Sequence, residues 1–325
     1  MIGEDPYVKT EEDQLKEYNS SIYIPQLVFL GLDGAKTGHE ALEYKDEYKG
    51  APYFALDVTP KKTAEEAAKK LMSKFESQGL KFAEGRLNLS LKAPEAAIYA
   101  EGRHLLDWNA RNPFCAGCGQ PTFSINGGWK RACPATDAAA TPPQRAACDT
   151  RHGISNLSFP RTDPTVIMAV VSADGGRVLL GRQKRWPPHW FSTLAGFLEP
   201  AESVEEAVRR EVWEESGIAL GRVVVHSTQP WPYPANLMIG AVGQSVPGDG
   251  EKIHLGHDAE LEDAKWFTLE EIREALRVGT SGLGDPPGPG YREGGLRLPP
   301  RTAIAHQLLH AVVNTGFLNG GDAKI

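Results

Sequence analysis

Three glutamates lie close together near residue 212, at a spacing that suits metal chemistry. Glu211, Glu214 and Glu215 fall within one predicted helix, where residues three and four apart share a face, so their carboxylates converge. Like charges at such a distance repel unless cations lie between them, and Mg²⁺ binds carboxylate oxygens together with substrate phosphates. The cluster therefore predicts magnesium-dependent phosphate chemistry. On composition alone, an ordinary acidic surface helix is an equally good interpretation.

The segment around these glutamates carries the signals of a helix start and a helix end. Ser203 and Glu206 form a capping box, S-x-x-E, which satisfies backbone N–H groups at the start of a helix. Gly217 stands where a left-handed residue commonly ends a helix. Apolar residues follow the helical period and predict a buried face, at positions 204, 207, 208 and 212.

The same segment, residues 196–218, resembles a complete Nudix box. The matching residues are Gly196, Glu202, Arg210-Glu211-Val212, Glu214-Glu215 and Gly217-Ile218. Nudix enzymes hydrolyse a nucleoside diphosphate linked to another group. The resemblance implies that Glu211, Glu214 and Glu215 bind Mg²⁺ or Mn²⁺, while Glu202 and Arg210 pair across the unit and brace the loop.

All four cysteines of the chain lie in a second cluster, within residues 111–160. Cys115 and Cys118 form a C-x-x-C knuckle, and Cys133 and Cys148 follow, each separated from the previous cysteine by 14 residues. Thiolates at this density are typical of a closed tetrahedral Zn²⁺ site with a structural role. His152 is an alternative to Cys148 as the fourth ligand, and four free buried cysteines are the competing interpretation. The insertion PATDAAATPPQRAA, residues 134–147, is predicted to be a flexible loop.

A third segment narrows the substrate. Residues 228–234, TQPWPYP, resemble the S-Q-P-W-P-F-P signature of NADH pyrophosphatases, with Thr228 replacing Ser and Tyr233 replacing Phe. Alternating prolines favour a rigid extended chain that fixes its aromatic side chains, although an edge strand containing prolines would look the same. Further similarities make the resemblance span nearly the whole chain and indicate fungal, peroxisome-type members: PYFALDV at 52–58, NPFCAGCG at 112–119, FPRTDP at 159–164 and LAGF at 194–197.

This resemblance implies a reaction and a set of binding residues. Family members cleave the pyrophosphate of NADH or NAD to nicotinamide mononucleotide and AMP, some remove NAD caps from RNA 5′ ends, and they form homodimers. The implied substrate-binding residues are Phe197, stacked on adenine, and Gln229, Trp231 and Tyr233 of the signature. Glu260 is implied as a fourth metal-binding and catalytic glutamate, with Asp258 and Glu262 as alternative registers.

Two other functions compete with this one. The first is Nudix hydrolysis of ADP-ribose or a related dinucleotide, against which the signature segment argues. The second is a non-catalytic zinc-ribbon or nucleotide-binding module, against which the intact set of glutamates argues.

The helices and strands expected along the 325 residues predict an α+β fold. Strands are expected at 26–31, 52–58, 165–171, 177–180, 223–226, 237–242 and 264–267, and helices at 64–75, 95–108, 269–278 and 302–313. This order predicts a Nudix α/β/α sandwich around a mixed sheet, preceded by a smaller α+β domain and a zinc-ribbon-like segment. The expected ranges are 1–110 for the N-terminal domain, 111–160 for the zinc-binding segment, 161–318 for the catalytic domain and 319–325 for a tail.

Composition and the chain ends bear on partners and location. A net charge of −7 argues against a broad nucleic-acid-binding surface, yet a nucleotide or a capped RNA end needs only local positive charge. No apolar run is long enough for a transmembrane helix, and the polar start does not read as a secretory signal. The last residues, Ala323-Lys324-Ile325, resemble a variant of the S-K-L peroxisome address. We therefore expect peroxisomal import through its receptor, with a cytoplasmic location as the alternative.

Overall fold

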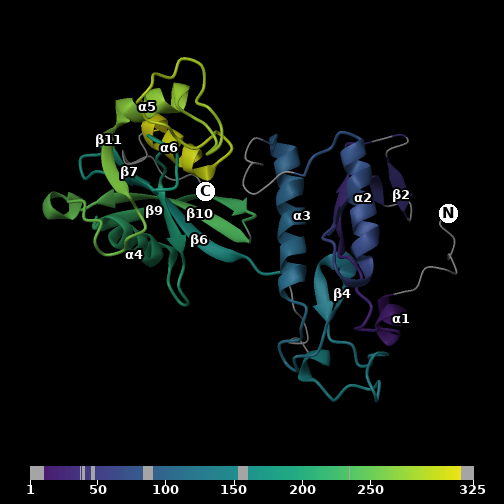
Figure 1. Ribbon diagram of the computed structural model, residues 1–325. Coiled ribbons are helices and arrows are strands. Elements are labelled where there is room, and N and C mark those ends of the chain that lie inside the picture. Colours follow the sequence, from purple (N-terminus) through teal and green to yellow (C-terminus); the bar gives the residue numbers. More distant parts are fainter. Residues whose placement is uncertain are drawn as a thin grey trace. The chain divides into compact units, whose positions relative to one another are not determined.

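The computed structural model describes residues 11–36, 38, 41–44, 48–82, 91–152, 160–233 and 235–315. The tripeptide at 323–325, Phe159 and Pro234 lie outside these residues. The chain forms two compact units, of which unit 1 holds most residues before 162 and unit 2 most residues after it (Figure 1). Within the described ranges, no helix combines the length and the apolar character that crossing a bilayer requires.

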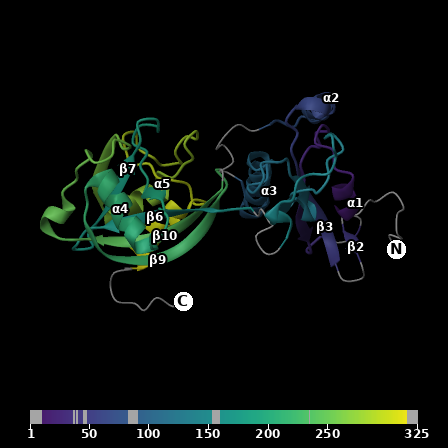
Figure 2. The ribbon, with the colours of Figure 1, turned by 90° about the horizontal axis from the view of Figure 1, so that it is seen from below.

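Unit 2 is built on a six-stranded mixed sheet. Its strands follow the order β11-β7-β6-β10-β9, and β8 also pairs with β6. β6 and β10 run parallel, whereas the other pairings are antiparallel; β6, β10 and β9 can be followed side by side in Figure 2. The elements are β6 (Asp163–Val171), β7 (Arg177–Arg182), β8 (Leu194–Phe197), α4 (Val204–Ser216), β9 (Leu220–Trp231), β10 (Asn236–Ser245), β11 (Asp263–Thr268), α5 (Leu269–Val278) and α6 (Ile304–Thr315).

Helices cover both faces of this sheet, with α4 on one side and α5 and α6 on the other (Figure 1). Successive side chains of a strand point to opposite faces, and β6 supplies both cores. Its residues 166, 168 and 170 lie in the core beside α4, while residues 167, 169 and 171 lie in the core beside α5 and α6. The predicted α/β/α sandwich is confirmed, and its helices and strands overlap the expected ranges.

The first half of the proline-rich segment is extended, as the sequence predicts, and it forms part of a strand. It continues β9, where Pro230 lies opposite Leu237 of β10. Because β9 is the edge strand of the sheet, a residue without an N–H group is tolerated there. The alternative interpretation, an edge strand with prolines, is therefore the one that the structure supports.

Unit 1 combines a small sheet, helices and a short hairpin, as predicted for the N-terminal domain and the ribbon segment. The sheet is antiparallel with the order β1-β3-β2. Gly102 of α3 lies against Ala55 and Leu30, and a Cβ at this position would stand 3.1 Å from the Ala55 Cβ, so glycine lets the helix approach closely. The elements are α1 (Glu11–Lys16), β1 (Leu27–Asp33), β2 (Leu42–Tyr44), β3 (Tyr48–Leu56), α2 (Glu65–Ser77), α3 (Ala93–Arg111), β4 (Phe123–Ile125) and β5 (Lys130–Ala132).

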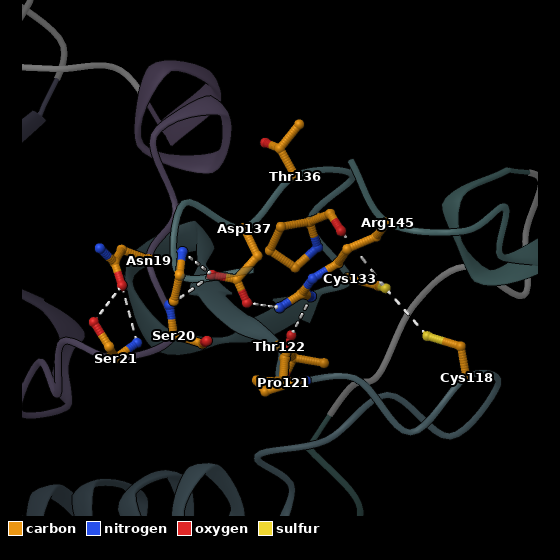
Figure 3. Close-up of polar contacts among 12 residues, drawn as sticks. Asn19, Ser20, Ser21, Cys118, Pro121, Thr122, Cys133, Thr136, Asp137 and Arg145 are labelled. Atoms are coloured by element: carbon orange, nitrogen blue, oxygen red, sulfur yellow. Dashed lines mark hydrogen bonds and ion pairs between the residues drawn. The ribbon is translucent and has the colours of Figure 1, made fainter. Parts of the chain in front are cut away.

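The insertion at 134–147 is not the flexible loop that its composition predicts. It folds around a buried ion pair, in which Arg145 donates to Asp137 at 2.7 Å and both side chains are about 5% exposed or less (Figure 3). Arg145 also donates to the Pro121 carbonyl, and Asp137 accepts from the Ser20 N–H at 2.9 Å. Burial alone would raise the pKa of Asp137, but the hydrogen bonds from Ser20 and Arg145 hold it well below its usual value. Composition does not predict this arrangement, because the groups that complete it, Ser20 and the Pro121 carbonyl, lie outside the insertion.

We predict that unit 1 depends on this ion pair. The substitution Asp137→Asn leaves a buried guanidinium without its counter-charge, and we expect it to lower the free energy of unfolding of unit 1 by about 3–5 kcal/mol. The exposed pair of Lys49 and Glu43 offers a matched control, because Glu43→Gln should change that quantity by less than about 1 kcal/mol. Urea unfolding measures both. Equal effects of the two substitutions would contradict the prediction.

Candidate active site

Helix α4 begins and ends where the sequence places it, and it fixes the orientation of the glutamates. Ser203 Oγ accepts from the Glu206 N–H at 3.3 Å, and Glu206 accepts from the Ser203 N–H at 2.9 Å. Gly217 ends the helix with a φ of 72° and a ψ of 0°. The apolar face expected from the period lies in the core of unit 2, with Ala207, Val208 and Val212 fully buried. The glutamates therefore project from a rigid and well-capped helix.

Arg210 is the cation at the centre of the glutamate cluster. Its guanidinium binds both carboxylate oxygens of Glu202, at 2.6 and 2.8 Å, which is the pairing expected from the sequence. Its Nη1 donates to Glu211 at 2.8 Å and to Glu214 at 2.9 Å, and its Nη2 donates to the Phe197 carbonyl at 2.8 Å. The hydrogen bond from Arg210 lowers the pKa of Glu202 to about 2. One side chain thus ties the loop before α4 to the helix.

Gly196 is required by the position of Glu211. A Cβ built on Gly196 would overlap the Glu211 carboxyl group, so any other residue would displace that carboxylate. The glycine serves close approach rather than an unusual backbone conformation.

Glu215 is buried and lacks a full set of partners. It is 5% exposed, and its Oε2 has no hydrogen-bond partner among the described residues. Burial raises the pKa of Glu215 to about 8, and the charges of Glu211, Glu260 and Asp258 add to the effect. Burial also raises the pKa of Glu211, against the opposing influence of Arg210. A divalent cation would relieve both the desolvation and the repulsion, although among the described residues only the four cysteines already bring their ligand atoms within 4.8 Å of one another.

The three alternatives for the fourth acidic ligand have different surroundings. Glu262 forms an ion pair with Arg182. The backbone N–H of Asp258 donates to the Glu214 carbonyl at 3.1 Å. The charge of Glu260 contributes to the raised pKa of both Glu211 and Glu215, and the charge of Asp258 contributes to that of Glu215. These surroundings favour Glu260.

An apolar cavity of about 210 Å³ adjoins Glu215. Its lining includes Ile167 of β6, Gly181 of β7 and Leu194 of β8, which lie at the junction of these three strands. The indole rings of Trp186 and Trp190 meet edge to face, 4.8 Å apart, and line the cavity together with Trp231. The other lining residues include Gln183, Ser192, Thr193, Ala195, Met238, Leu261, Leu283 and residues 299–300 and 303–305.

The substrate-binding residues expected from the sequence do not all lie at this cavity. Trp231 lines it, and Phe197 lies 55% exposed at the end of β8. Both polar atoms of the Gln229 side chain bind the backbone at the start of α6, since it donates to Thr302 at 2.7 Å and accepts from Ile304 at 2.8 Å. Gln229 thus positions a helix. Tyr233 lies in the turn after β9 and is not among the residues that line the cavity.

Sequence reasoning missed the walls formed by Trp186, Trp190 and Thr193. The run RWPPHWF at 185–191 offered a signal, because two tryptophans flank two prolines immediately before the LAGF segment. Arg182 fastens this wall, since its guanidinium donates to the Trp186 carbonyl at 2.9 Å and pairs with Glu262.

The four cysteines of unit 1 meet at one point. Their sulfur atoms all lie within 4.8 Å of one another, with 3.8 Å between Cys115 and Cys148 and 3.6 Å between Cys118 and Cys133. Four ligands at about 2.3 Å around a tetrahedral Zn²⁺ would lie about 3.8 Å apart, whereas a disulfide needs about 2.05 Å. The thiol set therefore fits zinc, and it contains Cys148 rather than His152.

Three family models match the chain in succession. They are an NADH pyrophosphatase-like rudimentary NUDIX domain over residues 4–108, an NADH pyrophosphatase zinc ribbon domain over residues 110–139 and a NUDIX domain over residues 162–282. The ribbon match ends before Cys148, so the structure places in the cluster a cysteine that this match does not reach.

Curated relatives are similar over most of the chain. NAD-capped RNA hydrolase NPY1 of Saccharomyces cerevisiae is 37% identical over 298 residues, covering 88% of this chain and 72% of that protein. NAD(P)H pyrophosphatase NUDT13, mitochondrial, of Mus musculus is 32% identical over 322 residues, covering 95% and 84%. NAD-capped RNA hydrolase NUDT12 of Homo sapiens is 37% identical over 301 residues and 91% of this chain, which spans 58% of the length of the human protein.

We predict that Glu215 makes stability depend on pH when no divalent metal is added. Its raised pKa means that the stability supplied by the protonated carboxyl is complete below the ordinary glutamate pKa and is lost as the pH rises toward about 8. Glu215→Gln should therefore match the wild type near pH 4 and exceed its free energy of unfolding at pH 8 by about 2–4 kcal/mol. Added Mg²⁺ should stabilise the wild type more than the variant.

Thermal unfolding across this pH range, with and without Mg²⁺, makes the measurement. Glu205→Gln, an exposed site on the same helix, is the matched control and should show no such trend. A Glu215→Gln curve parallel to the wild type at every pH would refute the prediction.

Proposed function

Because the chain belongs to the Nudix hydrolases of the NADH pyrophosphatase type, we propose that it hydrolyses the pyrophosphate bond of NADH and NAD. The products would be nicotinamide mononucleotide, reduced when the substrate is NADH, and AMP. The observation that carries this proposal is the place of Glu215, which belongs to the carboxylate cluster of α4 and also borders the tryptophan-lined cavity. A pyrophosphate bound at these carboxylates would therefore lie next to the cavity, and the cavity could hold a ring attached to that pyrophosphate.

The residues proposed to hold Mg²⁺ or Mn²⁺ are Glu211, Glu214, Glu215 and Glu260. The bound cation would neutralise pyrophosphate charge and lower the pKa of a bound water. Arg210 holds Glu211 and Glu214 in their orientation through Nη1. Glu260 is the proposed acceptor of the proton from the attacking water, because its carboxylate is exposed and engaged in no ion pair among the described residues. The box glutamates are the alternative acceptors.

The cavity supports one orientation of the dinucleotide. Its volume suits a single ring, and its tryptophan walls offer stacking surfaces to the nicotinamide. Phe197 lies exposed at the end of β8 and is the proposed stacking partner of adenine. In an NAD-capped RNA the chain continues from the adenosine, so an adenine at the open end leaves a path for RNA. The same orientation therefore accepts free NADH and a capped 5′ end, and we propose both as substrates.

Unit 1 is proposed to bind one structural Zn²⁺ through Cys115, Cys118, Cys133 and Cys148. Four thiolates leave no open coordination position, so this ion would take no part in hydrolysis. Homodimer formation and peroxisomal import remain predictions from the sequence, and the residues 323–325 that motivate the second lie outside the described part of the chain.

We predict that the protein with Mg²⁺ converts NADH to reduced nicotinamide mononucleotide and AMP. Chromatography of reactions with NADH, NAD, ADP-ribose and NAD-capped RNA identifies the products and the preferred substrate. Glu214→Gln removes a ligand charge from an exposed edge of the cluster, so turnover should fall by about 10²–10³-fold with an unchanged unfolding midpoint. Wild-type turnover by this variant would contradict the metal assignment, and a preference for ADP-ribose would contradict the proposed substrate.

A separate prediction concerns zinc content. Cys148→Ala should lower bound zinc well below one ion per chain and destabilise unit 1, because the ion ties distant segments together. His152→Ala is the matched control and should retain the full zinc content. Elemental analysis of both purified variants decides between the two candidate ligands, and zinc loss in the histidine variant alone would reverse the assignment.

A further inference from the structure

We propose that Thr193 is a specificity-determining residue, whose hydroxyl group forms a hydrogen bond with the carboxamide of the nicotinamide ring in the tryptophan-lined cavity. This inference rests on the proposed function and adds a polar contact that selects the ring. It begins from a hydroxyl group that the protein itself leaves without a partner.

Thr193 is buried, lines the cavity and carries an unsatisfied polar atom. It is 5% exposed, and its Oγ1 has no hydrogen-bond partner in the described part of the chain. Other buried hydroxyl groups of unit 2 are satisfied: Ser216 Oγ donates to the Val212 carbonyl at 2.6 Å, and Ser245 Oγ donates to Glu251 at 2.8 Å. A buried polar group without a partner is destabilising, so the orphan hydroxyl of Thr193 indicates a ligand group that completes it.

Thr193 lies directly before β8, within a run of four residues, 192–195, that line the cavity. Within β8, Ala195 and Phe197 share one face, since the period of a strand is two residues. Ala195 lines the cavity with a small side chain, and Phe197 is exposed at the other end. Gly196 points to the opposite face, where it meets Glu211. This stretch therefore offers a buried hydroxyl group before β8, a small side chain within the strand and an exposed aromatic ring at its end.

The chemistry of the cavity favours a carboxamide as the partner of this hydroxyl. A threonine hydroxyl can donate one hydrogen bond and accept others, and a carboxamide presents a carbonyl oxygen and an NH₂ group. The walls formed by Trp186, Trp190 and Trp231 provide stacking surfaces but few polar contacts. A buried polar contact of this kind discriminates strongly against a ligand that lacks the matching group. A nicotinamide ring would stack on the tryptophan walls and its carboxamide would bind the Thr193 hydroxyl, whereas ADP-ribose has no nicotinamide to make either contact.

The test compares the two products, reduced nicotinamide mononucleotide and AMP, which differ in the ring attached to the ribose phosphate. Thr193→Val removes the hydroxyl while keeping the branched shape, and we expect kcat/KM for NADH to fall about tenfold, the equivalent of one neutral hydrogen bond. Binding of the two products gives a readout without turnover, because the pocket tryptophans should be quenched by reduced nicotinamide mononucleotide. Its Kd should rise by the same factor, while the Kd of AMP should stay within twofold. Thr193→Ser, which restores the hydroxyl, should recover most of the loss.

Ser245→Ala is the matched control, because it removes a buried hydroxyl whose partner, Glu251, lies away from the cavity. It should leave the ratio of the two product affinities unchanged. Equal losses for reduced nicotinamide mononucleotide and AMP in Thr193→Val, or no loss for either, would overturn the inference. Absence of NADH hydrolysis by the wild type would instead overturn the proposed function, so the two failures are distinguishable.

Discussion

Repulsion among the carboxylates of α4 is the constraint on which the active-site half of this protein depends. Glu211 and Glu215 are held in a largely buried cluster, where burial and mutual charge raise the pKa of both groups. The two caps of α4 and the packing of its apolar face in the core of unit 2 hold these groups in place. Arg210 provides the compensating charge, and it reaches Glu202, Glu211 and Glu214 at once. The remaining repulsion lowers the local stability of this cluster unless a cation binds there.

The second structural condition is the junction of three strands. β8 and β7 pair with β6 in succession, Gly181 and Ser192 join β7 to the start of β8, and residues of all three strands line the cavity. The carboxylates and the cavity meet at Glu215, so the proposed metal site and the proposed ring pocket adjoin each other. Arg182 holds the loop that carries Trp186, because it donates a hydrogen bond to the Trp186 carbonyl and forms an ion pair with Glu262.

Local features of the sequence predicted local features of the structure. The capping box at Ser203, the end of α4 at Gly217 and the buried face of α4 follow from rules that act within one helix, and they are present. The predicted pairing of Glu202 and Arg210 is also present. The cavity was not predictable in this way, because its lining comes from residues between 167 and 305. Composition likewise misjudged the insertion at 134–147, since Asp137 finds its partners at Ser20 and Arg145.

The buried pair in unit 1 has a consequence for how that unit acquires its structure. The contact between Ser20 and Asp137 closes a loop of 117 residues, and the Arg145 side chain must arrive at the same place. Burying either charge alone is strongly unfavourable, so intermediates that assemble only part of this contact are poorly populated. Long-range contacts of this kind raise the contact order and slow folding. Unit 1 should therefore form cooperatively, once nearly all of its chain has been synthesised.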